Sequence, residues 1–262
     1  MHKRPDGFHE IASLFQAIDL CDRLFISPSR HDEITCTDPS IPLDETNYVI
    51  QALKLFRCWY STTTVEIHIE KRIPTQAGFG GGSSNAATTL WALNELSGRP
   101  ATIQELIHIG SKIGSDVPFF FFLGTAYCTG RGEILEPFVL PKPLSGYLAK
   151  PEYGLSTPFV YRLTDTKTLP KRDPQEALKN YPQFFNDLEV ASLKIESRLK
   201  TLRAKLKKQF KHAVMTGSGT AFFCLEGIPS KIEEVSFHPF TVVQRPDEKS
   251  WYQLNKPIRT TG

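Results

Sequence analysis

The sequence has no long apolar run, and this absence excludes a membrane-spanning helix. Such a helix needs about 20 consecutive apolar residues, whereas the longest run here, from Val117 to Leu123, is short and contains Pro118. The first ten residues, MHKRPDGFHE, carry no apolar stretch after their basic residues, so we expect no secretory signal. We therefore expect a cytoplasmic protein that does not bind membranes.

Motifs for metal binding and redox chemistry are also missing. The five cysteines form no CxxC motif, and the seven histidines form no HExxH motif or other close pair. We expect reduced thiols and no metal centre built from protein ligands alone. The net charge of +3 is far from that of a dedicated nucleic-acid-binding protein, so we expect no nucleic-acid partner.

The chain is long and apolar enough to build a sizeable core. Its 262 residues fit one large domain or two ordinary ones, and 40% of them are hydrophobic. Three prolines lie within residues 137–146 (PFVLPKPLSG), a composition typical of a connection. We place a domain boundary there, which gives domains of residues 1–143 and 144–262.

Apolar spacing predicts alternating strands and helices. We expect one or two strands in residues 11–26, a loop in 27–46, and a helix over Tyr48 to Trp59 capped by Asn47. Further segments are expected as follows: a strand at 65–73, a helix ending at Gly98, a helix from Thr102 to about Gly114, and strands at 119–123, 126–135 and 221–225.

A long amphipathic helix is predicted in the second half. Its apolar face would carry Ile195, Leu199, Leu202, Leu206 and Phe210. The opposite face is rich in lysine and arginine. A basic face could contact nucleic acid or a membrane surface, but a solvated face on a packed helix is the interpretation we favour.

The densest glycine cluster, PTQAGFGGGSSN from Pro74 onward, lies between a predicted strand and a predicted helix. Exposed backbone N–H groups at a helix start favour anions, and phosphate is the usual ligand. No lysine follows the glycines, as a Walker A motif requires, and the third glycine of the Rossmann pattern is Ser83. A connector without a ligand remains the alternative.

The string from Pro74 to Ala87 closely resembles the phosphate loop of the GHMP kinases. Residues 215–221 (MTGSGTA) resemble the C-terminal glycine motif of the same family. Residues 3–10 (KRPDGFHE), 114–118 (GSDVP) and 185–189 (FNDLE) resemble a branch of the family whose substrate is a cytidine diphosphate sugar alcohol of the non-mevalonate isoprenoid pathway. The resemblance extends from residue 3 to about residue 225.

The resemblance implies a two-domain α+β fold, with an N-terminal domain like domain 2 of ribosomal protein S5 and a ferredoxin-like C-terminal domain. It further implies that ATP and Mg²⁺ bind in the cleft between the domains, and that the partner is a small cytidine diphosphate substrate of a monomeric or homodimeric enzyme. The residues implied to surround the ATP phosphates are Pro74, Thr75, Gln76, Ala77, Gly78, Phe79, Gly80, Gly81, Gly82, Ser83 and Ser84.

The resemblance also implies that Asp116 is the base that takes the proton of the substrate hydroxyl. Without the resemblance, the alternative interpretation of Asp116 is a turn or helix-capping aspartate. Phe8 and His9 match the cytosine pocket of the branch, and Phe184, with Phe185 as the alternative, matches its second aromatic residue. The C-terminal motif contributes Gly217 and Gly219, which are expected to contact substrate. Without the resemblance, Phe8 would be interpreted as a core residue and His9 as a structural histidine.

One motif of the family is absent from this sequence. The family's P-A-K-L-N-L segment, with its lysine, precedes the segment that Lys3 begins here, and this sequence starts at Met1. Two explanations compete: a start assigned at an internal methionine, which we favour, and a degenerate member of the family. Besides the leading hypothesis, another GHMP small-molecule kinase and a nucleotide-binding homologue without catalysis remain as alternatives.

Overall fold

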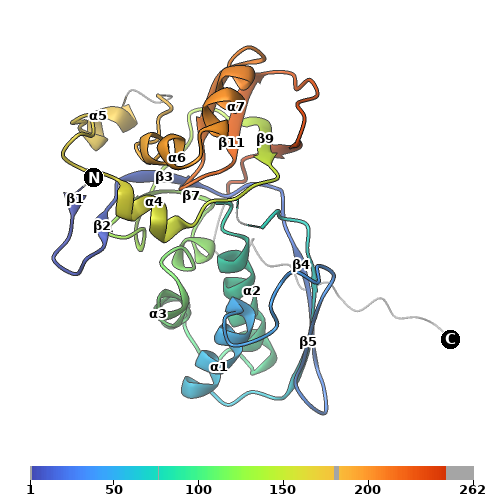
Figure 1. Cartoon of the computed structure of the whole chain (residues 1–262). Coiled ribbons are helices and arrows are strands. Elements are labelled where there is room, and N and C mark those ends of the chain that lie inside the picture. The colour runs from blue at the N-terminus through green and yellow to red at the C-terminus, as the bar shows by residue number, and fades with distance from the viewer. Residues whose placement is uncertain (1, 76, 180–182, 246–262) are drawn as a thin grey trace.

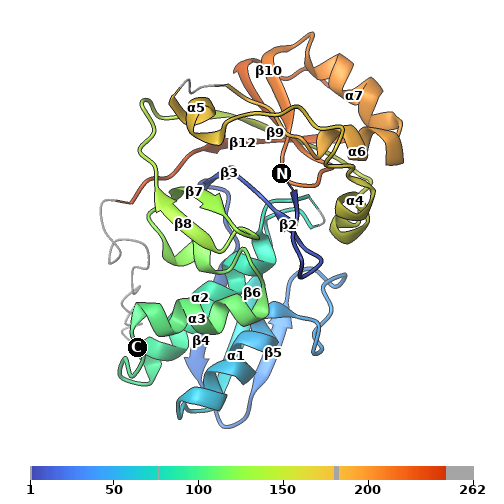
Figure 2. The same ribbon diagram turned by 90° about the vertical axis from the view of Figure 1, so that its left-hand side faces the viewer.

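The computed structural model describes residues 2–75, 77–179 and 183–245. These residues form two halves. The helices and strands within residues 23–113 make up the end of the molecule that is lowest in Figure 1, and those within residues 145–241 form the other end. The strands at residues 13–16, 125–129 and 134–137 lie between the two ends (Figure 2).

The N-terminal half contains three small sheets and three long helices. Its sheets are β1–β2, β3–β7–β8 and β4–β6–β5, and β5 alone pairs in parallel. The strands are β1 (His2–Lys3), β2 (His9–Glu10), β3 (Ser13–Gln16), β4 (Arg23–Pro28), β5 (Glu33–Cys36), β6 (Val65–Glu70), β7 (Thr125–Thr129) and β8 (Ile134–Pro137). The helices are α1 (Tyr48–Trp59), α2 (Gly81–Leu96), α3 (Ile103–Ile113) and the 3₁₀ turn η1 (Pro118–Phe121).

Local sequence explains most of these elements. The Asn47 side chain accepts a 2.9 Å hydrogen bond from the Val49 N–H and caps α1. Thr102 and Glu105 form a capping box at the start of α3. The alternating apolar side chains of β6 and one face of each long helix form a common core, which includes Phe56, Ile67, Leu90, Leu106 and Ile109. The predicted starts of α1 and α3 are therefore confirmed.

The C-terminal half is an antiparallel sheet of order β10–β11–β9–β12 with helices on one side. The strands are β9 (Ser145–Pro151), β10 (Phe210–Met215), β11 (Phe222–Gly227) and β12 (Val235–Thr241), and the helices are α4 (Thr157–Leu163), α5 (Pro174–Lys179), α6 (Glu189–Ile195) and α7 (Arg198–Leu206). This strand order is that of a ferredoxin-like domain. Since β11 and β12 both pair antiparallel with β9, they run parallel to each other, and residues 228–234 cross between them without a helix.

Three predicted elements are wrong. The long amphipathic helix is two helices, α6 and α7, and Phe210 begins β10 because the Gln209 N–H closes a turn on the Leu206 carbonyl at 2.9 Å. Residues 119–123, expected as a strand, contain the 3₁₀ turn η1, which Pro118 begins. The loop expected over residues 27–46 contains β5, which is stabilised by pairing with the distant β6.

The chain returns to the N-terminal half after β12. The Val243 N–H donates to the Ala17 carbonyl at 2.8 Å, and the Arg245 N–H donates to the Leu123 carbonyl at 3.0 Å. Gly124, with φ +93°, permits this approach, since a Cβ there would be 2.3 Å from the Val243 carbonyl oxygen. The boundary at residues 143 and 144, which precedes β9, stays a prediction, and the residues after β12 link the two halves.

Candidate active site

The glycine-rich loop leads from β6 into the N-terminus of α2. Gly78 and Gly80 have φ values of +73° and +67°, a conformation that favours glycine. Gly80 precedes the first residue of α2 and makes no side-chain cap, and the first turn contains no acidic residue. The backbone N–H groups of this turn and the dipole of a 16-residue helix form a site for a phosphate group.

Some residues of the loop are buried in the core and others are exposed at the surface. Ala77 and Ser83 are buried, Pro74, Phe79 and Ser84 are half-buried, and Thr75, Gly78 and Gly82 are exposed. Gln76 lies outside the described residues. The Phe79 ring packs on the apolar cluster of the C-terminal half that includes Leu148 and Phe240, so the loop contacts both halves.

The second glycine motif lies directly against this loop. A Cβ at Gly78 would be 3.1 Å from the Thr216 carbonyl oxygen and 3.6 Å from that of Gly219. Gly217 and Gly219 have φ values of +53° and +91°. Asn186 holds this motif from the side, because its Nδ2 donates to the Met215 and Gly217 carbonyls at 2.7 Å each. The structure thus brings together two glycine motifs separated by more than a hundred residues.

A buried carboxylate anchors the entry to the phosphate loop. The Asp22 side chain is 1% exposed and pairs with Lys71 Nζ at 2.9 Å. Its Oδ1 accepts the Arg72 and Ile73 N–H groups at 2.7 Å each, and its Oδ2 accepts Asn85 Nδ2 at 2.9 Å. Asp22 therefore joins the start of the loop to the first turns of α2.

Asp116 lies between α3 and η1, in the segment against which the phosphate loop packs. A Cβ at Gly80 would be 3.1 Å from the Phe120 ring, and the Tyr48 ring lies beside both Gly82 and Gly114. Burial raises the pKa of the Asp116 carboxyl, and a hydrogen bond with Ser115 opposes this change. A carboxylate with a raised pKa is a better base for a hydroxyl proton.

Two groups from other elements lie within the electrostatic influence of Asp116. Burial, with the Asp116 charge as a further cause, raises the pKa of Tyr161 on α4 to about 12. Burial and the same charge raise the pKa of Cys128 on β7 to about 12, so both groups are neutral near pH 7. The Tyr161 ring in turn contacts the His9 ring, with 5.4 Å between centroids. Asp116, Tyr161 and His9 therefore form one region at the junction of the two halves.

His9 and Phe8 lie on the β1–β2 hairpin and face different surroundings. Burial and the charge of Lys3 lower the pKa of His9, so its ring is neutral near pH 7 and has both a donor and an acceptor nitrogen. Phe8 is 54% exposed, and its ring lies 4.9 Å from the guanidinium carbon of Arg131. An exposed ring and a neutral imidazole on the same hairpin suit stacking and edge recognition of a base.

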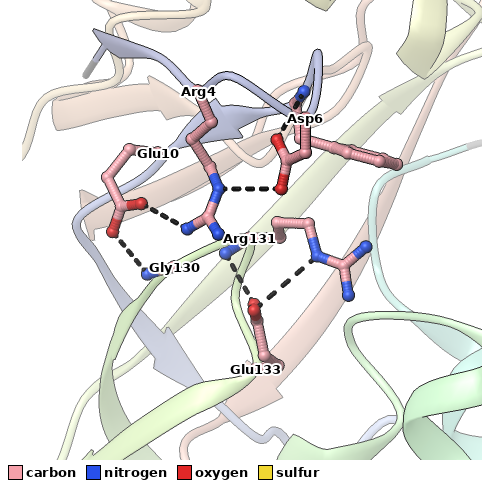
Figure 3. Close-up of polar contacts among 7 residues, drawn as sticks. Arg4, Asp6, Glu10, Gly130, Arg131 and Glu133 are labelled. Atoms are coloured by element: carbon pink, nitrogen blue, oxygen red, sulfur yellow. Dashed lines mark hydrogen bonds and ion pairs between the residues drawn. The ribbon is translucent and has the colours of Figure 1, made fainter.

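Ionic contacts stabilise the hairpin internally, and a hydrogen bond joins it to the loop between β7 and β8 (Figure 3). Arg4 pairs with Asp6 at 3.1 Å and with Glu10 at 2.6 Å. The Phe8 N–H donates to Asp6 at 3.1 Å, and the Gly130 N–H donates to Glu10 at 2.8 Å. These contacts hold Phe8 at a defined position relative to residues 130–133.

Phe184 lies in the C-terminal half. Its ring contacts His212 and Phe223, with centroids 5.1 Å and 5.4 Å apart. It lines a cavity of about 340 Å³ together with Phe185 and basic residues of α7 and β10, and neither Phe8 nor His9 is in that lining. The pairing of Phe8 with Phe184 across one base therefore stays a prediction.

Comparison with known proteins assigns the family. Residues 47–124 match the family described as GHMP kinases N terminal domain. The chain is 47% identical over 236 residues to the 4-diphosphocytidyl-2-C-methyl-D-erythritol kinase of Protochlamydia amoebophila, with 85% of this chain and 78% of that protein covered. The chain belongs to the 4-diphosphocytidyl-2-C-methyl-D-erythritol kinase family.

Other members of this family differ from the chain in length. The chloroplastic kinase of Mentha piperita is 42% identical over 235 residues, but the chain spans only 58% of its length. The crystal structure of a 4-(cytidine 5'-diphospho)-2C-methyl-D-erythritol kinase superposes with a TM-score of 0.76 at 30% identity, covering 92% of this chain and 93% of that one. The mevalonate kinase of Methanococcus jannaschii, with a TM-score of 0.61 at 14% identity, shares the fold. The predicted α+β GHMP kinase fold is confirmed.

Several residues of this kinase-family site carried no sequence signal of their own. Asp22, Tyr161 and Arg131 belong to no recognisable local motif, and their partners are distant in the chain. Asn186 lies in the matched FNDLE segment, but no role was expected for this residue. Within the described residues there is no cluster of three or more His, Cys, Asp or Glu side chains that could hold a metal, and no helix long and apolar enough to cross a membrane.

Proposed function

We propose that this protein transfers a phosphoryl group from ATP to a hydroxyl of 4-diphosphocytidyl-2-C-methyl-D-erythritol, the compound in the names of its relatives. The observation that carries the proposal is the packing of the phosphate loop on the Asp116 segment through Phe120 and Tyr48. A phosphate donor at the start of α2 and a base in the adjoining turn are the two parts that a small-molecule kinase requires.

Each group has a distinct role in the proposed reaction. The loop from Pro74 to Ser84 holds the ATP phosphates with backbone N–H groups, and Gly217 and Gly219 border it. Asp116 accepts the proton of the attacking hydroxyl, and its raised pKa brings it closer to that of the hydroxyl. Phe8 stacks on the cytosine, and His9 contacts the polar edge of the base.

Magnesium fits this site as a partner of the ATP phosphates. With no three-ligand cluster in the described part of the chain, the ion would be held mainly by phosphate oxygens and water, as Mg²⁺ often is. Ser84, half-buried, and the more buried Ser83 are the hydroxyl groups in the first turn of α2 that could contribute to holding it. The ion supplies charge neutralisation for the transferred phosphoryl group.

The substrate assignment is tested by release of ADP from ATP with separate acceptors. We expect ADP release with 4-diphosphocytidyl-2-C-methyl-D-erythritol, much slower release with the uridine analogue, and none above background with homoserine or mevalonate. The uridine analogue is discriminated because the hydrogen-bonding edge of its base differs. Release of ADP with homoserine or mevalonate, but not with the cytidine compound, would contradict the proposal.

A further inference from the structure

Arg131 lies on a short loop that is fixed between the base-binding hairpin and Asp116. Its neighbours Gly130 and Gly132 have φ values of +69° and +116°. The Gly130 N–H donates to Glu10 of the hairpin at 2.8 Å. On the other side, a Cβ at Gly132 would be 3.6 Å from Asp116 Oδ1. The backbone on either side of Arg131 therefore contacts both ends of the candidate site.

The Arg131 side chain is held in place but keeps donor groups available. Its guanidinium carbon lies 4.9 Å from the Phe8 ring centroid, and Nε lies 3.6 Å from Glu133 Oε1. The Arg131 N–H also donates to Glu133 at 2.6 Å. Among the described residues no hydrogen bond to its two Nη atoms is recorded, and Figure 3 shows them pointing away from Arg4 and Glu10. The side chain is 36% exposed.

The other arginine of this region is already paired. Arg4 uses Nε on Asp6 and Nη1 on Glu10, so both carboxylates of the hairpin are engaged by it. The Glu133 contact of Arg131 is longer, at 3.6 Å from Nε to Oε1. Arg131 is thus the arginine of this cluster that can present a planar pair of N–H donors to a bound anion.

The position of Arg131 corresponds to the middle of the proposed substrate. In a cytidine diphosphate ester of a sugar alcohol, the diphosphate separates the base from the hydroxyl that is phosphorylated. Phe8 is the base-stacking residue and Asp116 the hydroxyl-activating residue of the proposed function, and the Arg131 loop touches the environment of both. We propose that Arg131 binds the diphosphate of the cytidine substrate and selects nucleoside diphosphates over free nucleosides, an inference that rests on the proposed function.

Calorimetric titration with CDP and with cytidine tests this role without requiring turnover. The wild-type protein should bind CDP more tightly than cytidine. Arg131→Gln should weaken CDP binding on the order of 10- to 100-fold, the range for loss of charge-assisted hydrogen bonds, and leave cytidine binding unchanged. Arg131→Lys keeps the charge but loses the planar pair of N–H donors. Its affinity for CDP should therefore lie between those of the wild type and of Arg131→Gln. Arg30→Gln, an exposed arginine on a different loop, is the charge-matched control.

The outcomes separate this proposal from the function on which it rests. Unchanged CDP binding in Arg131→Gln would overturn the role of Arg131 and leave the proposed kinase function standing. Equal losses for CDP and cytidine would also overturn it, because they would mean that Arg131 only supports the Phe8 ring. A wild-type protein that binds neither compound would overturn both. In steady-state kinetics we expect Arg131→Gln to raise the KM for the cytidine substrate and not the KM for ATP.

Discussion

At the scale of single residues, the environment of Asp116 has a cost in stability. Burial raises the pKa of this carboxyl in the folded protein above its value of about 3.9 in an unfolded chain. The favourable contribution of this group to the stability of the folded protein is complete at pH values below the unfolded pKa. It is lost as the pH rises through the folded pKa. Above that folded pKa the protein therefore carries an ionised carboxylate in an unfavourable position.

Asp116→Asn should accordingly unfold at a higher denaturant concentration than the wild type at pH 7. The difference should shrink as the pH is lowered toward 4, because the wild-type carboxyl then becomes neutral as well. Urea titrations of both proteins across this pH range measure the effect. A variant that is less stable than the wild type at pH 7 would mean that the hydrogen bond with Ser115 outweighs the burial of the charge.

Sequence patterns indicate some of these residues and not others. The glycine loop could be predicted because consecutive glycines at a helix start favour binding of a phosphate group. Asp116 and His9 could be predicted only through the resemblance to a family. The role of Asp22 could not be predicted from the sequence, because its partners Lys71, Ile73 and Asn85 are about 50 or more residues away. Contacts of this kind arise only when the strands and α2 have assembled.

At the scale of elements, Asp22 connects β4 and β6 to the phosphate loop. Removing its carboxylate by Asp22→Ala leaves the buried Lys71 ammonium unpaired, and loss of one partner of a buried pair costs about 3–5 kcal/mol of unfolding free energy. Asp22→Asn keeps the size but places an amide among donors. We expect this variant, where it remains folded, to bind ATP several-fold more weakly and CDP normally, because only the phosphate loop has shifted.

Titration of Asp22→Asn with a non-hydrolysable ATP analogue and with CDP measures this positioning role. Asp44→Asn, a change at an exposed turn aspartate, is the matched control. If the folded Asp22→Asn protein binds the ATP analogue as tightly as the wild type, Asp22 supports only the fold. Gly81→Val would be a poorer test, because a Cβ at Gly81 already lies 3.1 Å from Ile73 and 3.4 Å from Lys71 Nζ.

The same scale shows why the predicted long helix was wrong. Leu199, Leu202 and Leu206 are buried on one face of α7, and Phe210 continues the spacing of this face in the sequence. Phe210 is also buried, but as the first residue of β10. A single buried aromatic residue fits either a helix or a strand, so apolar spacing does not reveal the turn between them.

At the scale of the whole molecule, the two halves meet at the candidate site. The phosphate loop and Asp116 come from the N-terminal half, whereas Tyr161, Gly217 and Gly219 come from the C-terminal half. The residues after β12 pair with Ala17 and Ile18, just after β3, and with Leu123, and so connect the halves. The α+β class and the two-part organisation follow from the sequence, but the short β11–β12 crossover and this return segment depend on pairing between distant strands.

In the proposed reaction Asp116 acts as the base in phosphoryl transfer to the cytidine compound. The most direct test is the rate of ADP release with saturating ATP and 4-diphosphocytidyl-2-C-methyl-D-erythritol, measured for the wild type and for Asp116→Asn. We expect a loss in kcat on the order of 10²–10⁴, with CDP binding little changed. A folded Asp116→Asn protein that retains most of the wild-type turnover would contradict the account.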